Sequence, residues 1–308
     1  MAEEIRCCIC DEPLTPPYNV LGSRTYCARH FASVNKPHPG FWRAGIVQLV
    51  GMTVFTAVVA GLGNALGEVT TTGRLGLGIF LAIVPALLWM TYFYQQDRLE
   101  PEPKERLALV FFIALALFEI LGRRVIDDVF RVSEWAAYDT TTSLLAHMLI
   151  NGVVYQVCMY LAVRFGVYAS PEFDERMDGI VYGTVAGLGV ATMLNLRYIL
   201  DNNGVAVAPG VIQTVTMALA QASFGGLMGW FMAEAKFIHK RTLWVPIGFG
   251  ISALLNGFFT WLTREVSSSG LSVDPFRQLG LGTLVAVAML GLMVILMRHS
   301  AKATLSRS

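Results

Sequence analysis

Four residues near the start of the chain have the types and the spacing of a metal site. In "RCCICDEPL…SRTYCARHF", two residues separate Cys7 from Cys10, two separate Cys27 from His30, and sixteen lie between the pairs. Thiolate and imidazole ligands in two such knuckles suit tetrahedral zinc. Cys8 is either spare or a substitute for Cys7. Because protein side chains fill all four positions, we expect the zinc to be structural rather than catalytic.

These ligands lie in a polar segment that is too short to form a hydrophobic core of its own. Four of the five cysteines fall within residues 1–40, and zinc binding would supply the free energy that folds such a segment. The alternative is a reduced cytosolic loop with incidental cysteines, since a cytosolic location disfavours disulfides. We therefore predict a cytoplasmic zinc-knuckle-like module at 1–40, with Zn²⁺ as its cofactor.

The elements that follow must lie in a membrane. Apolar residues make up 55% of the chain and charged residues 15%, whereas about a quarter of a soluble domain is charged. Runs of about 20 apolar residues, the length that spans a bilayer, recur at 45–63, 75–94, 105–121, 142–165, 178–199, 211–233, 243–263 and 278–297. The fold class predicted is all-α, a polytopic membrane helix bundle of about eight transmembrane helices at 41–298. A basic cytoplasmic tail follows at 299–308.

The distribution of Lys and Arg predicts the orientation of this bundle. With eight spans, the two termini share one side with three of the loops, and that side carries sixteen of the 23 Lys and Arg residues. The positive-inside rule then puts both termini in the cytoplasm, for a multi-pass protein of the inner (cytoplasmic) membrane. The net charge of +1 gives no reason to expect a nucleic-acid partner.

Two stretches of the bundle carry a more specific pattern. "YQQDRLEPEP" at 94–103 places two Glu-Pro pairs at a helix exit, where proline favours a rigid, extended connector. "FDERMDGIVYGTVAGLG" follows at 173–189. In order and spacing, these motifs and the segments after them resemble the PrsW family of intramembrane proteases over about residues 91–297. The resemblance implies that this region forms the family's helical core.

The resemblance also implies where the family's reactive groups would lie. The family has Glu-Glu-x-x-Lys on one helix, Phe-x-x-x-Glu on the next, a His on the third and often His-x-x-x-Asp after it. Such groups activate water by metal ligation or general-base action. The corresponding positions here hold Tyr155, Gln156, Met159, Val190, Leu194, Gln221, Asn256 and Thr260. None of these side chains shuttles a proton near pH 7, so the resemblance implies the fold without its reaction.

One polar helix face offers a different intramembrane site. His147, Asn151 and Tyr155 recur every four residues and share a face, and Asn195 is a further polar residue within a span. Polar groups inside a membrane usually face other protein. The alternatives are a site for a metal, a pigment or a lipid headgroup, or a network of interhelical hydrogen bonds. Asp178 is expected to cap the N-terminus of its helix.

Three functions are compatible with this sequence. The favoured one is a non-catalytic scaffold or accessory subunit, with membrane lipids and other membrane protein subunits as partners. The second is an active intramembrane protease that uses shifted residues such as His147 and Asp178. The third is a transporter or channel subunit whose neutral polar cavity is lined by Asn151, Gln156, Asn195, Gln221 and Asn256.

Overall fold

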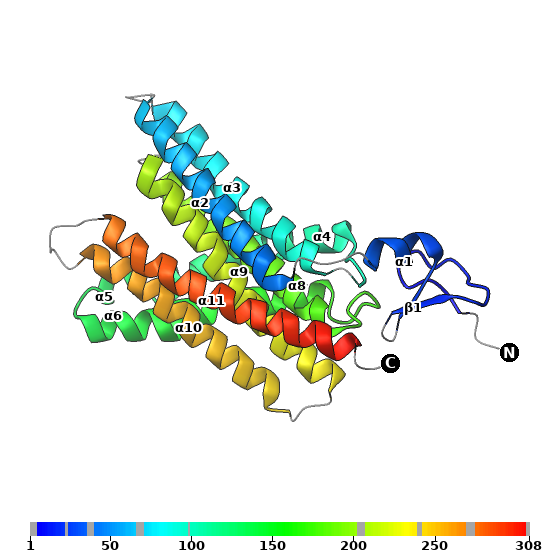
Figure 1. The fold of residues 1–308 in the computed structure, drawn as a ribbon. Helices are drawn as coiled ribbons and strands as arrows, with labels where there is room; N and C mark the ends of the chain where they lie inside the picture. The colour runs from blue at the N-terminus through cyan, green and yellow to red at the C-terminus, as the bar shows by residue number, and fades with distance from the viewer. Residues whose placement is uncertain are drawn as a thin grey trace.

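The structure, a computed structural model, describes residues 5–21, 24–35, 40–65, 71–97, 99–201, 207–238, 242–268 and 275–305 of the chain. A small N-terminal module lies at one end of an elongated helical bundle (Figure 1). Helices dominate the described residues, which confirms the predicted all-α class.

The N-terminal module consists of one antiparallel hairpin and one short helix. Strand β1 (Asn19–Leu21) pairs with β2 (Arg24–Tyr26), with Asn19 opposite Tyr26. Helix α1 (Ala28–Val34) begins directly after β2, and Cys27 is its N-cap residue. Because the strand ends where the helix begins, Cys27 and His30 lie within one turn of each other, as a knuckle requires.

Long helices build the rest of the molecule. The bundle contains α2 (Phe41–Ala65), α3 (Thr71–Gln96), α4 (Lys104–Leu117), α7 (Gly152–Gly166), α8 (Arg176–Asp201), α9 (Val207–Phe237), α10 (Trp244–Ser268) and α11 (Pro275–Leu305). Short helices α5 (Val132–Trp135) and α6 (Thr140–Ala146) lie between α4 and α7, together with the π-helical turns η1 (Phe118–Gly122), η2 (Val125–Val129) and η3 (His147–Asn151). The predicted tail at 299–308 starts as the last turns of α11, and residues 306–308 lie outside the described part.

Seven of the eight predicted spans correspond to helices that are long and apolar enough to cross a membrane. The eighth, predicted at 105–121, is the shorter helix α4, which continues into the π turn η1. Together α4 and η1 cover 104–122, about 28 Å of helix at 1.5 Å per residue, close to the ~30 Å of a hydrocarbon core. The described parts of both chain ends lie at the same end of the bundle (Figure 1).

Helices α8 and α9 form the centre of the bundle. In each, 83% of the most apolar stretch is buried, against 11% for α2 at the periphery. The two helices touch through small residues: a Cβ added to Gly183 of α8 would collide with the backbone of Gly225 in α9. Gly187 meets the backbone at Gln221 in the same way. Small residues four apart allow this close approach of membrane helices, so glycines of the 173–189 motif set the packing of the core.

Candidate functional sites

The four predicted zinc ligands meet in the N-terminal module. The ligand atoms of Cys7, Cys10, Cys27 and His30 all lie within 4.8 Å of one another. His30 Nδ1 is 3.5 Å from Cys7 Sγ and 3.3 Å from Cys27 Sγ, and the Sγ atoms of Cys10 and Cys27 are 4.0 Å apart. Tetrahedral zinc with 2.3 Å bonds to sulfur separates its ligands by about 3.5–3.8 Å. These four residues therefore fit a structural zinc ion.

The local electrostatics distinguish Cys7 from Cys8. Burial raises the pKa of the Cys7 thiol, but hydrogen bonds from backbone amides, including that of Cys27, and from His30 outweigh it and lower the pKa to about 6. Burial raises the pKa of Cys8 to about 12. Zinc binds the thiolate form, so the environment favours Cys7 as the ligand.

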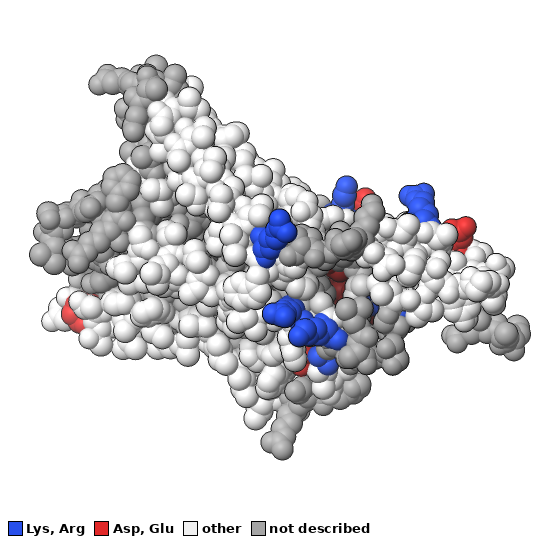
Figure 2. Space-filling view, in the orientation of Figure 1, with Lys and Arg blue, Asp and Glu red and all other residues white. Residues whose placement is uncertain are grey.

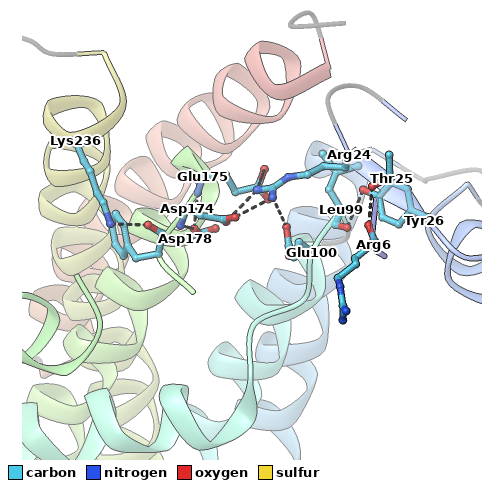
Figure 3. A network of polar contacts seen from close by, with 11 residues as sticks. Arg6, Arg24, Thr25, Tyr26, Leu99, Glu100, Asp174, Glu175, Asp178 and Lys236 are labelled. Atoms are coloured by element: carbon cyan, nitrogen blue, oxygen red, sulfur yellow. Dashed lines mark hydrogen bonds and ion pairs between the residues drawn. The ribbon is translucent and has the colours of Figure 1, made fainter. Parts of the chain in front are cut away.

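The module is joined to the bundle by the side chains of β2 (Figure 3). Arg24 makes a two-pronged contact with Asp174, at 2.8 and 2.9 Å, and an ion pair of 2.8 Å with Glu100. The hydroxyl of Tyr26, whose side chain is fully buried, donates to the carbonyl oxygen of Leu99 at 3.0 Å. The module therefore contacts the bundle at the two sequence motifs, 94–103 and 173–189. Nothing in the sequence pairs Arg24 with an acid 150 positions away.

Beneath this contact, Asp97, Glu102 and Asp178 form a buried group of carboxylates whose ligand atoms also lie within 4.8 Å of one another. Burial raises the pKa of Asp97 well above its usual range, and neighbouring carboxylates raise it further. Burial likewise raises the pKa of Glu102 to about 7. This group was not predicted from the sequence. The concentration of acids in two motifs of an apolar chain is visible in the sequence, but no local pattern indicates that the two motifs meet.

Asp178 caps helix α8, as predicted. It lies in the first turn, and its Oδ2 accepts hydrogen bonds of 2.7 Å from the backbone amides of Asp174 and Glu175. An acid at this position that reaches back to the residue before the helix forms one half of a capping box. The cap fixes the start of α8 against the connector that carries Glu102.

In the bundle interior, Gln221 of α9 and Asn256 of α10 bind each other. Gln221 Nε2 donates to Asn256 Oδ1 at 2.9 Å, and Asn256 Nδ2 donates to Gln221 Oε1 at 2.8 Å. Both side chains are fully buried. The reciprocal pair joins two helices and leaves both amide oxygens hydrogen-bonded, as burial in an apolar environment requires.

The other positions aligned with the family's reactive groups lie on α7, α8 and α10. The side chains of Met159 and Val190 are buried in the hydrophobic core, and Thr260 donates its hydroxyl to the carbonyl of Asn256 at 2.9 Å. Gln156 is fully buried, and neither of its polar side-chain atoms has a hydrogen-bond partner among the described residues. The ring of Tyr155 packs edge-on against the ring of Phe118, with 5.4 Å between the two ring centroids.

A pocket of about 310 Å³ brings together part of the predicted polar site. Asn151, Tyr155 and Leu194 line it, with Arg123, Asp127, Arg197 and Asp201 among its charged residues. Asn195 instead donates to the carbonyl of Thr214 at 3.1 Å, and His147 Nδ1 lies 2.8 Å from the carbonyl of Ser143. The predicted face is therefore divided between a pocket and hydrogen bonds within and between helices.

His147 and Asp178 lie far apart. His147 is near the start of the helical segment 140–166, whereas Asp178 is in the first turn of the next helix, which begins ten residues after that segment ends. The twenty residues from His147 to Gly166 span about 28 Å of helix. The two side chains therefore do not form an acid–base pair.

Comparison with known proteins matches the PrsW family of intramembrane metalloproteases to residues 102–297. Protease PrsW of Geobacillus kaustophilus is 31% identical over 186 residues, covering 60% of this chain and 78% of that protein. Protease PrsW of Bacillus subtilis is 25% identical over 201 residues, covering 64% and 88%, and that of Oceanobacillus iheyensis is 26% identical over 204 residues, covering 64% and 87%. No solved structure gives a significant match.

Proposed function

The chain belongs to the PrsW family of intramembrane metalloproteases, and from that premise we propose that it is a member without peptidase activity. It acts as a non-catalytic scaffold or accessory subunit of a membrane complex. The observation that carries this proposal is the buried pair of Gln221 and Asn256. At the two positions where the resemblance implies histidines, this chain has neutral amide side chains that hydrogen-bond to each other.

The family's description implies a metal, and the residues at the aligned positions do not fit one. Catalytic zinc is held by His, Cys, Asp or Glu with one coordination position open. Here the aligned positions offer a phenol, two hydrogen-bonded amides, the amide of Gln156 and the aliphatic side chain of Leu194. Among the described residues, the groups of three or more Cys, His, Asp or Glu close enough to hold a metal lie elsewhere, in the module and at Asp97, Glu102 and Asp178.

The structure also weakens both alternatives. A protease that uses shifted residues would need His147 close to an acid such as Asp178. The helix from His147 to Gly166 separates His147 from the start of α8, where Asp178 lies. A transporter would need its polar residues along one water-filled path. Gln221 and Asn256 bind each other and Asn195 binds a helix carbonyl, whereas Asn151 lines the pocket.

The test of this proposal is an activity assay on the full-length protein in its own lipids. Membrane proteins and peptides that the active PrsW proteases cleave should remain intact when this protein is added, at all metal concentrations tried. The His147→Ala variant should behave identically. Cleavage by the wild-type protein that disappears in His147→Ala would overturn the proposal in favour of an active protease.

A complementary variant restores the family's groups. Tyr155→Glu, Gln156→Glu, Leu194→Glu, Gln221→His and Asn256→His are combined in one chain, and metal content is measured after purification. We expect more bound zinc per chain than in the wild type, because acids and imidazoles replace neutral groups. An equal zinc content in the two proteins, with folding intact, would contradict the assignment of these positions.

The N-terminal module is assigned structural Zn²⁺ and a docking role on the cytoplasmic side. Both termini are placed in the cytoplasm and the protein in the inner membrane, which rests on the positive-inside rule. On the face drawn in Figure 2, Lys and Arg gather toward the end that carries the module. A domain division at 1–40, 41–298 and 299–308 goes with this topology. Cysteine-accessibility labelling from either side of sealed vesicles tests it.

Other membrane protein subunits are the proposed partners, beside lipids. Helix α2 exposes apolar side chains along its length, including Ile46, Val50, Val54 and Val58. This surface contacts lipid or a neighbouring subunit. Purification of the intact complex from its native membrane tests which of the two it contacts.

A further inference from the structure

The two sequence motifs that the proposed function leaves without a role meet in space. Asp97 and Glu102 belong to the connector after α3, and Asp178 belongs to the first turn of α8. Their exposed fractions are 3%, 5% and 1%, and one ligand atom of each lies within 4.8 Å of the other two. Three carboxylates at such distances repel one another strongly unless a cation or protons neutralise them.

Donors from outside the group hold two of these carboxylates. Tyr182 donates its hydroxyl to Glu102 Oε2 at 2.5 Å, and the amides of Asp174 and Glu175 donate to Asp178 Oδ2 at 2.7 Å. Each of these two acids is thereby oriented through one oxygen. Metal-binding carboxylates are commonly oriented in this way by surrounding hydrogen bonds.

Asp97 gives the independent observation. Its Oδ2 is buried and has no hydrogen-bond partner among the described residues, although its ligand atom lies close to those of Glu102 and Asp178. A buried carboxylate oxygen without a partner is destabilising. Because one oxygen of the Asp97 carboxylate lies within 4.8 Å of an oxygen of each of the other two acids, a cation or a proton among the three would stabilise it.

The described cations nearby bind other groups. Arg24 pairs with Asp174 and Glu100 (Figure 3). The ammonium of Lys236 donates to the carbonyls of Tyr168 and Phe173 at 2.8 and 2.6 Å. Arg176 pairs with Glu234 at 3.2 Å and Arg106 with Glu172 at 3.7 Å. Arg98 lies outside the described residues. No ion pair joins the described cations to Asp97, Glu102 or Asp178.

We propose that Asp97, Glu102 and Asp178 form a binding site for one hard divalent cation beneath the N-terminal module. Three carboxylates without sulfur or imidazole ligands suit Mg²⁺, Mn²⁺ or Ca²⁺ rather than zinc. Bond lengths of about 2.1–2.4 Å to oxygen let one ion between the acids reach all three with little movement. The bound ion would tie the connector after α3 to the start of α8.

Manganese is the test ion because its binding can be counted by electron paramagnetic resonance. The full-length protein, with its zinc module intact, is titrated with Mn²⁺ in lipid nanodiscs at pH 7.5. We expect one Mn²⁺ per chain, displaced by excess Mg²⁺ or Ca²⁺. Asp97→Asn and Glu102→Gln should each weaken binding at least tenfold. The control, Glu172→Gln, removes a nearby acid outside the group and should leave binding unchanged.

Two results would overturn the proposal. One is the absence of stoichiometric Mn²⁺ binding by the wild-type protein, which would mean that no divalent cation neutralises the acids. The other is full retention of binding in both Asp97→Asn and Glu102→Gln, which would place the ion elsewhere. Circular dichroism and zinc content confirm that each variant is folded. Because the readout is ion binding, it is independent of any peptidase activity.

Discussion

Single residues determine whether this bundle can hold a polar group at its centre. Gln221→Ala should destabilise the protein by about 1–3 kcal/mol, because the amide of Asn256 stays buried and loses its partner. Removing both partners is less costly, so Gln221→Leu with Asn256→Leu should recover most of the loss. Thermal unfolding in detergent micelles measures all variants. If Gln221→Leu and Asn256→Leu, measured singly, destabilise the protein by amounts that sum to the effect of the double variant, the two side chains are not coupled.

The cysteines give a second prediction at this scale. Cys7→Ser should abolish zinc binding, because Cys7 is the thiol whose environment lowers the pKa and whose Sγ lies 3.5 Å from His30 Nδ1. Cys8→Ser is the matched control, one position away, and should keep one zinc per chain. Atomic absorption of the purified variants measures this. Loss of zinc in Cys8→Ser with retention in Cys7→Ser would reverse the assignment.

At the scale of elements, the contact between α8 and α9 depends on the absence of side chains. Gly183→Ala should destabilise the bundle by about 1–3 kcal/mol, because its Cβ would overlap the carbonyl of Gly225 and push the helices apart. Gly51→Ala in α2 is the control. No atom lies within 4 Å of a Cβ there, so the helix should become slightly more stable, by up to about 1 kcal/mol.

Unfolding temperatures of the two alanine variants, measured in the same detergent, check this prediction. Equal values for Gly183→Ala and Gly51→Ala would mean that the two helices can separate without loss. That result would mean that close packing of α8 against α9 does not explain the glycines of the 173–189 motif.

Most helices could be predicted from the sequence, because membrane-spanning helices are recognised by long runs of apolar residues. The limits of α4 could not, since the segment after Leu117 stays helical but changes to wider turns, which hydropathy does not detect. The knuckle of Cys27 and His30 was predictable because its spacing is local. The pairing of Arg24 with Asp174, and the meeting of Asp97 with Asp178, depend on packing across the molecule, and no local pattern encodes either.

At the scale of the whole molecule, a few side chains connect the module and the bundle in the part of the chain that the structure describes, which makes their coupling testable. Arg24 is the main ionic link, and it binds the same two segments that carry the group Asp97, Glu102 and Asp178. The N-terminal module therefore stabilises the connector after α3 and the start of α8. Weakening the link should loosen these segments and leave the centre of the bundle unchanged.

Arg24→Gln is the variant that tests this coupling, with zinc still bound. Hydrogen exchange should accelerate at 99–103 and at 172–176, because the guanidinium no longer joins Glu100 to Asp174, while the interior of α8 and α9 stays protected. Arg29→Gln, an exposed arginine of α1 in the same module, is the control and should change nothing. Cys27→Ser, which removes one of the four proposed zinc ligands, should reproduce the effect of Arg24→Gln. If Cys27→Ser loosens these segments and Arg24→Gln does not, the module is held by contacts other than Arg24, and the buried hydroxyl contact of Tyr26 with Leu99 becomes the main connection.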